Sequence, residues 1–187
     1  YRDKERYRAK AKKRKRIKFL FIITLLIISY FFISSLKNKN INANLYNFMK
    51  DKSSREVVYN QAIKLNNGSS ANTCVYFIAE ALRKNGEKID YSVCNTSELL
   101  SVMNKSGWKK EEDIKKIKPG DICFTTDEKL SKSGVPSHTY IFMGWKEEGK
   151  YDYAFVCDNQ AKDYSGNIYH IRNIIKEDKV NGNQKEP

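Results

Sequence analysis

The sequence predicts an α+β domain in which helices precede an antiparallel β-sheet, with one transmembrane helix before the domain. Three observations lead to this prediction. Residues 19–36 form an uncharged, strongly apolar run. Apolar residues then recur at helical spacing as far as Gly107, and after Pro119-Gly120 the pattern changes to short β-type runs separated by turns. Helices followed by strands are typical of α+β domains, whose helices pack against the sheet.

The net charge is concentrated in a basic tail at the N-terminus. The 187 residues carry a formal charge of +13, and residues 1–18 hold eleven Lys or Arg against two acidic residues, a net charge of +9. The remainder is only mildly basic, and no folded nucleic-acid-binding module accompanies the tail, so no nucleic acid is expected as a partner. We interpret the tail as topogenic charge that also attracts anionic lipid.

The apolar run is long enough to cross a membrane. As a helix, residues 19–36 would span about 27 Å, close to the ~30 Å hydrocarbon core of a bilayer. The alternative is a cleaved signal peptide, but the run is longer than a usual h-region and no A-x-A-like site follows it. The positive-inside rule predicts a single-pass protein with the tail in the cytoplasm and the rest outside.

The exported part starts with residues 37–52, which are polar and rich in Asn and which we interpret as a stalk. The spacing of apolar residues then predicts three helices, over about 53–66, 72–85 and 95–107. The last of them starts like a capping box, with Glu98 three residues after an Asn.

Four strands are predicted after these helices, and turns containing Gly, Ser or Pro separate them. The strands are residues 121–126, 138–145, 151–158 and 167–174. The folded domain therefore covers residues 53–176, and residues 177–187 are predicted to be a flexible tail.

The four cysteines are Cys74, Cys94, Cys123 and Cys157. They contain no C-x-x-C pair, so neither a zinc site nor any other metal site is expected. Export would permit a disulfide, for example Cys94–Cys123. Cys123 and Cys157 both fall in predicted strands, where a free cysteine is more commonly a small apolar residue. The sequence leaves the disulfide state open.

Cys74 is distinguished by its position near the start of a predicted helix. The helix dipole and the free backbone amides there stabilise a thiolate, although a buried structural cysteine is the alternative. His138 opens an apolar strand after a loop and could serve as the general base for a thiol nucleophile. The other histidine, His170, is interpreted as structural or exposed.

A third group is needed to hold the imidazole in the correct tautomer. The strand 151–158 ends in three candidates, Asp158, Asn159 and Gln160. Strand alternation predicts Asp158 and Gln160 on one face of the sheet and Asn159 on the other.

Several segments follow one another in the order of a known superfamily. A helix that contains Cys74 (NTCVYFIAEALRKNG) precedes the motif IKPGDI at 117–122, the strand SHTYIFMG at 137–144 and the strand end VCDNQ at 156–160. The set resembles the papain-like cell-wall hydrolases, the NlpC-type and CHAP-type cysteine peptidases and amidases. Thr73 stands where these families usually carry Asp or Gln before the nucleophile, so the sequence does not choose between the two types.

The resemblance implies a papain-like fold and a set of catalytic roles. Cys74 would be the nucleophile and His138 the general acid and base, and Asp158 would orient His138, with Asn159 as the alternative. The Cys74 amide would form the oxyanion hole together with one of three side chains. These candidates are Asn72, Ser70 and Gln160. Asp121, in the Pro-Gly-Asp turn, is interpreted as structural.

The implied function is a membrane-anchored peptidoglycan hydrolase that needs no cofactor. It would cleave, through an acyl-enzyme, either a stem-peptide bond or the amide between muramic acid and L-Ala, outside the cytoplasmic membrane. The alternative is a catalytically silent domain that binds the cell wall or a partner in an envelope assembly. The sequence identifies neither the scissile bond nor the oligomeric state.

Overall fold

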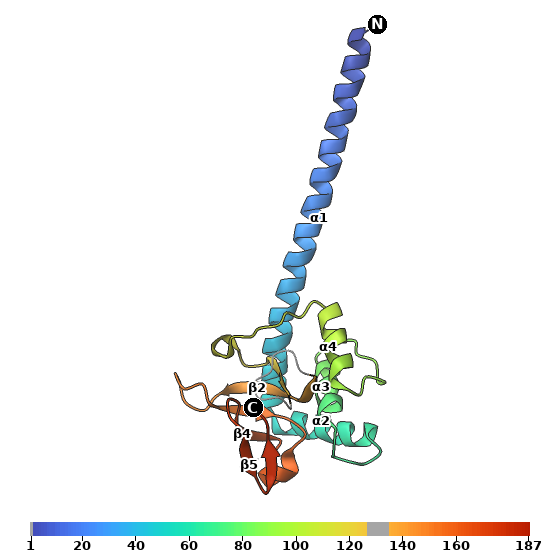
Figure 1. Cartoon of the computed structure of the whole chain (residues 1–187). Coiled ribbons are helices and arrows are strands. Elements are labelled where there is room, and N and C mark those ends of the chain that lie inside the picture. Colours follow the sequence, from blue (N-terminus) through green and yellow to red (C-terminus); the bar gives the residue numbers. More distant parts are fainter. Residues whose placement is uncertain (1, 127–134) are drawn as a thin grey trace. The chain divides into compact units, whose positions relative to one another are not determined.

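The computed structural model describes residues 2–126 and 135–187, without the side chains of 2–5, 7–11 and 34–40 (Figure 1). Most of the loop predicted before His138 lies outside these ranges. The chain divides into two units, Tyr1–Lys39 and Asn40–Pro187. Helix α1 (Arg2–Lys50) contributes to both.

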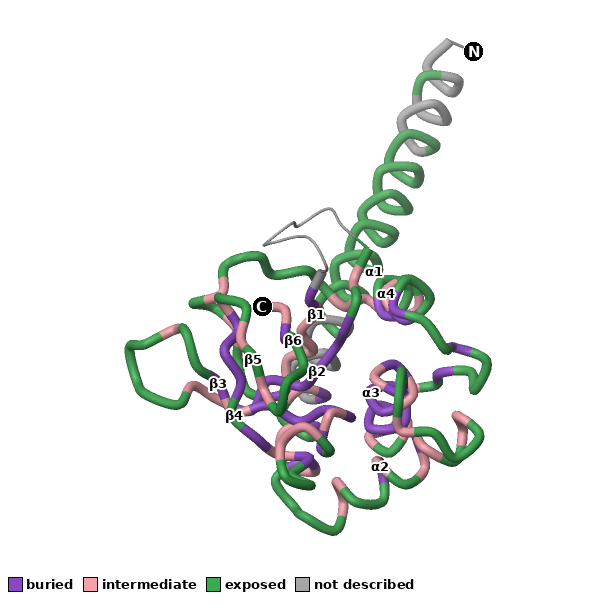
Figure 2. Tube along the Cα trace, turned by 60° about the horizontal axis from the view of Figure 1, so that its bottom comes forward, coloured by how far each residue is buried: buried purple, intermediate pink, exposed green. Residues whose placement is uncertain are grey.

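The first unit contains one helix that is long and apolar enough to cross a membrane. This candidate span is Lys12–Ile33, and it overlaps the predicted residues 19–36. Its residues are exposed, and Figure 2 shows this part of α1 in the colour of exposed residues. A run that is apolar on all sides cannot bury itself against one face of a domain, so length and composition both suit a bilayer.

The second unit begins with the end of α1, where the stalk prediction for residues 37–52 is wrong. The helix continues to Lys50, and Ile41, Leu45 and Met49 are buried. These three residues are spaced four apart and therefore lie on one face of the helix. The polar Asn residues between them made this apolar spacing difficult to recognise in the sequence. In the structure the apolar face packs into the domain core.

The next three helices are close to the predicted ranges. They are α2 (Lys52–Leu65), α3 (Cys74–Lys84) and α4 (Thr96–Lys105). Helix α2 starts one residue before Ser53 because Asp51 accepts a hydrogen bond from the Ser54 amide at 2.7 Å. Helix α4 is capped by Asn95, which accepts from the Glu98 amide at 2.9 Å.

The predicted antiparallel sheet is also present, which confirms the α+β class. Its strands are β1 (Ile122–Thr126), β2 (Pro136–Trp145), β3 (Tyr153–Cys157) and β4 (Tyr169–Asn173), in the order β1-β2-β3-β4. The described residues form two apolar clusters. The larger joins the helices to Ile141 and Cys157, and the smaller contains Phe142 and Val156. The alternation of buried side chains along β2 and β3 produces this division.

The C-terminal residues are ordered, so the prediction of a flexible tail over 177–187 is wrong. They form a hairpin of β5 (Asp178–Val180) and β6 (Asn183–Lys185). Lys185 is buried and forms an ion pair with Asp163. Contacts with residues distant in the sequence hold this polar segment, and local sequence patterns do not report such contacts.

The Pro-Gly-Asp turn joins the end of α1 to the sheet. Gly120 has φ +93°, and a Cβ atom there would lie 1.9 Å from the Asn42 carbonyl oxygen. Asp121 accepts hydrogen bonds from the Asn42 side-chain Nδ2 at 2.6 Å and from the Lys118 backbone N–H at 2.7 Å. The structural role predicted for Asp121 is therefore confirmed.

Candidate active site

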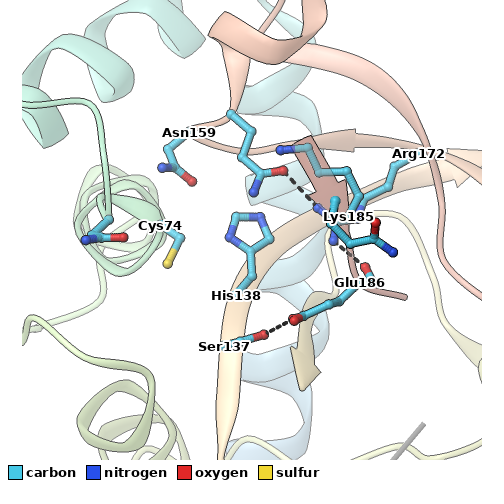
Figure 3. A pocket seen from close by; sticks show the side chains of 10 residues that line it. Cys74, Ser137, His138, Asn159, Arg172, Lys185 and Glu186 are labelled. Carbon is cyan, nitrogen blue, oxygen red and sulfur yellow. Dashed lines mark hydrogen bonds between the residues drawn. The ribbon is translucent and has the colours of Figure 1, made fainter. Parts of the chain in front are cut away.

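A pocket of about 220 Å³ lies where the start of α3, the start of β2, the end of β3 and the C-terminal hairpin meet (Figure 3). Its lining is predominantly polar and comes from five separate stretches of sequence, because Arg172 of β4 also contributes. The lining residues are Asn72, Cys74, Ser137, His138, Asn159, Gln160, Arg172, Gln184, Lys185 and Glu186.

Cys74 is the first residue of α3, where the sequence predicted a helix start. The preceding Thr73 is buried and makes no side-chain capping hydrogen bond; its hydroxyl donates to the Ser70 carbonyl at 2.9 Å instead. The first backbone amides of α3 are therefore not capped by Thr73. Amides in this position stabilise an anion, so the local structure favours negative charge on an oxygen beside the Cys74 sulfur.

His138 and Asp158 form a buried pair next to this thiol. The distance from His138 Nε2 to Asp158 Oδ2 is 2.9 Å, and both side chains are buried. Because Nε2 is engaged by the carboxylate, Nδ1 is the ring nitrogen left for Cys74. Burial disfavours the imidazolium, but the hydrogen bonds to Asp158 and Cys74 outweigh it, so the pKa of His138 is raised above its ordinary value.

Asp158 is fully buried and is surrounded by donors and cations. Its Oδ1 accepts from the Gln160 amide at 2.7 Å, and His170 Nε2 and Arg172 Nη1 each lie 3.8 Å from a carboxylate oxygen. Burial alone would raise the pKa of Asp158. The hydrogen bond from His138 and the surrounding positive charges more than compensate, so its pKa is lowered. The carboxylate therefore stays ionised.

Asn159, the alternative partner for His138, makes a different contact. Its Nδ2 donates to the Ser70 carbonyl at 3.3 Å, while its buried Oδ1 has no hydrogen-bond partner. In Figure 3 its side chain lies beside Cys74. Strand β3 ends at Cys157, so the strand alternation that predicted Asp158 and Asn159 on opposite faces does not extend to them. Both residues lie at the site, and Asp158 is the one that contacts the imidazole.

The three candidates for the second oxyanion donor differ in position. Asn72 and Gln160 line the pocket, whereas Ser70 is not among the lining residues. The Ser70 carbonyl instead accepts hydrogen bonds from Thr73 and Asn159. Asn72 is exposed and has φ +54°, and Gln160 is held by Arg172 at 3.0 Å.

Sequence reasoning missed Arg172 and the hairpin. Arg172 is buried, lines the pocket, and donates to Gln160 and to the Glu186 carbonyl. The Glu186 carboxylate accepts from Ser137. The local signal in the sequence was a predicted strand in which the charged Arg172 follows the apolar Ile171. This pattern did not show that Arg172 faces inward.

The remaining cysteines and His170 lie outside the pocket lining. All four cysteines are free, so the possible Cys94–Cys123 bridge is not formed. Burial raises the pKa of Cys123 to about 12 and also raises that of Cys157, which suits small apolar roles. His170 is buried and stacks on Tyr164 with ring centroids 3.5 Å apart. Burial lowers its pKa.

Within the described residues, no group of three or more His, Cys, Asp or Glu side chains is arranged to hold a metal ion. Comparisons with protein-family models, with curated proteins and with solved structures found no match for this chain.

Proposed function

We propose that this protein is a membrane-anchored cysteine hydrolase that cleaves an amide bond of peptidoglycan. The observation that supports the proposal best is that His138 contacts both Cys74, which lines the same pocket, and the buried Asp158. They come from α3, β2 and the end of β3, and the imidazole contacts both the carboxylate and the thiol. A nucleophile, a base and an orienting group in this order form the working unit of cysteine hydrolases.

The proposed reaction uses these groups in two steps. The Cys74 sulfur attacks the amide carbonyl carbon while His138 holds the thiol proton, and the oxyanion is stabilised at the start of α3. His138 then protonates the leaving amine, which departs as the carbon–nitrogen bond breaks. Water, deprotonated by His138, hydrolyses the thioester and restores the thiol. Asp158 stabilises the imidazolium throughout.

The substrate class and the location follow from the family resemblance and from α1. The resemblance to NlpC-type and CHAP-type enzymes favours peptidoglycan, cut in the stem peptide or at the muramic acid–L-Ala amide. The span Lys12–Ile33 would anchor the chain in the cytoplasmic membrane. The basic residues before it favour a cytoplasmic N-terminus and a hydrolase domain that faces the wall.

The experiment uses the full chain in detergent micelles with purified peptidoglycan, and identifies released fragments by mass spectrometry. Wild type is compared with Cys74→Ala and with Cys94→Ala, which removes an exposed cysteine outside the pocket lining. Fragments are expected from wild type and Cys94→Ala but not from Cys74→Ala, and their masses identify the bond. If the wild type releases no fragments from several wall types but sediments with the wall, the chain is a binding protein and the proposal is wrong.

A further inference from the structure

The hydrogen bond between Arg172 and Gln160 fixes which end of a carboxamide faces the pocket. Arg172 Nη1 donates to Gln160 Oε1 at 3.0 Å. A guanidinium has only donors, so it binds the carboxamide oxygen and not the nitrogen. With Oε1 held by Arg172, the Nε2 group of Gln160 is the end left for the pocket that this residue lines.

Both partners of this bond are themselves held in place. The Arg172 side chain is 2% exposed; its Nη2 donates to the Glu186 carbonyl, and its guanidinium lies over the Tyr140 ring. The Gln160 backbone amide donates to Asp158 Oδ1 at 2.7 Å. Gln160 is thus tied at its main chain to the carboxylate that binds His138 and at its side chain to Arg172, which leaves the carboxamide little freedom to rotate.

The neighbouring carboxamide is oriented the opposite way. Asn159 Nδ2 donates to the Ser70 carbonyl, so its oxygen is the end left over. A carbonyl oxygen cannot stabilise an oxyanion. Of the two adjacent carboxamides, Gln160 is the one whose oxygen is bound by the protein and whose nitrogen is the end left for the pocket.

We propose that Arg172 is a positioning residue that turns the Gln160 carboxamide so that its Nε2 becomes the second oxyanion donor, beside the Cys74 backbone amide. This inference rests on the proposed hydrolase function and names residues that carry part of it. Arg172 itself touches no reacting atom; it acts through Gln160. The preorganised donor is available when charge develops on the substrate oxygen, where such donors contribute most to rate.

The test compares two reactions of the same thiol in the full chain in detergent. With p-nitrophenyl acetate, the Cys74 sulfur bonds to the acyl carbon and the carbonyl electron pair moves onto oxygen. When the pair returns, nitrophenolate leaves and the acetyl group stays on sulfur. With iodoacetamide, the sulfur displaces iodide and no oxyanion forms. Only the first reaction needs the donor, so the two rates separate oxyanion stabilisation from thiolate reactivity.

Arg172→Met and Gln160→Glu should each slow Cys74 acetylation roughly ten- to a hundred-fold. Gln160→Glu keeps an acceptor for Arg172 but has no N–H donors. The rate at which iodoacetamide alkylates Cys74 should change less than about three-fold in these variants. Mass spectrometry of the peptide that contains Cys74 measures this rate, and the peptide that contains the exposed Cys94 serves as the reference. Arg172→Lys can still donate to Oε1 and should restore part of the acetylation rate.

A double mutant shows whether Arg172 acts through Gln160. Adding Arg172→Met to Gln160→Ala should slow acetylation no further than Gln160→Ala alone, because coupled residues are not additive. Arg83→Met, which removes a largely buried arginine near the other end of α3, controls for loss of a buried cation and should leave acetylation unchanged.

Four results would overturn the inference. An additive double mutant would mean that Arg172 acts independently of Gln160. Parallel loss of acetylation and alkylation in Arg172→Met would mean that it supports the thiol or the fold. If wild-type acetylation equals that of Cys74→Ala, the proposed hydrolase function fails as well. If acetylation depends on Cys74 but Arg172→Met does not slow it, only the role proposed for Arg172 is wrong.

Discussion

Asp158 accepts a hydrogen bond from His138 at 2.9 Å while His170 and Arg172 each lie 3.8 Å from the same carboxylate. One buried anion therefore serves three cationic or potentially cationic side chains. The carboxylate accepts a hydrogen bond from His138 but lies farther from His170. The pKa values of the two histidines are therefore shifted in opposite directions. Hydrogen bonds outweigh burial at His138, whereas burial dominates at His170.

The two histidines should titrate on opposite sides of pH 6.5. They are the only histidines of the chain, so NMR of their ring C–H groups in the full chain should give two curves, with the pKa of His138 above 6.5 and that of His170 below it. His170→Gln assigns the signals. Asp158→Asn should lower the pKa of His138, because the hydrogen bond to the carboxylate raises it. Two curves on the same side of pH 6.5 would contradict this picture.

Asp158 should make stability depend on acid pH. Its pKa is lowered from 3.8 to about 2 in the fold, so the folded state prefers the ionised form. This stabilisation, on the order of 2 kcal/mol, is complete above pH 3.8 and is lost as the pH falls toward 2. The free energies of unfolding of wild type and Asp158→Asn can be measured by urea unfolding followed by tryptophan fluorescence. The difference between them should become smaller as the pH falls over that range. A constant gap would rule out this linkage.

The end of α1 should contribute to the stability of the domain. Leu45 is fully buried in the core, so Leu45→Ala should reduce the free energy of unfolding by roughly 2–5 kcal/mol. Asn47→Ala, at an exposed position on the same helix, should change it by less than about 0.5 kcal/mol. Both tryptophans lie in the second unit, so their fluorescence reports on that unit. Equal effects of the two substitutions would favour the stalk interpretation.

Gly120 should tolerate no side chain. Alanine there would have to adopt φ +93° and would place Cβ 1.9 Å from the Asn42 carbonyl oxygen, so part of the backbone must move. We expect Gly120→Ala to reduce the free energy of unfolding by roughly 2–4 kcal/mol. Gly149→Ala has a similar φ of +78° but open space around it, and should lose only about 1 kcal/mol. Chemical denaturation compares the two, and similar losses would mean that the turn relaxes.

Local patterns were sufficient for the elements and for part of the site. Apolar spacing and capping residues located α2, α3 and α4, because helix formation depends on neighbours three and four positions apart. Alternation located the strands. These patterns placed Cys74 near the start of a helix and His138 at the start of a strand. They placed Asp158 at the end of the next strand.

The same patterns failed where distant contacts decide the structure. The end of α1 looked like a polar stalk, because three apolar residues among many Asn matter only once a core exists to receive them. The C-terminal hairpin looked like a tail, because its stability comes from Asp163 and Arg172.

The sequence by itself therefore determined the α+β class, an apolar segment able to cross a membrane, and Cys74 and His138 as the central pair of the candidate site. Only the tertiary structure decided that Asp158 rather than Asn159 binds His138, and that Arg172 donates to the Gln160 carboxamide oxygen. The physical reason is that a hydrogen bond depends on ångström-scale distance and on the direction of the donor. These are set by how β4 and the hairpin pack against the end of β3, and periodicity along the chain carries no information about that packing.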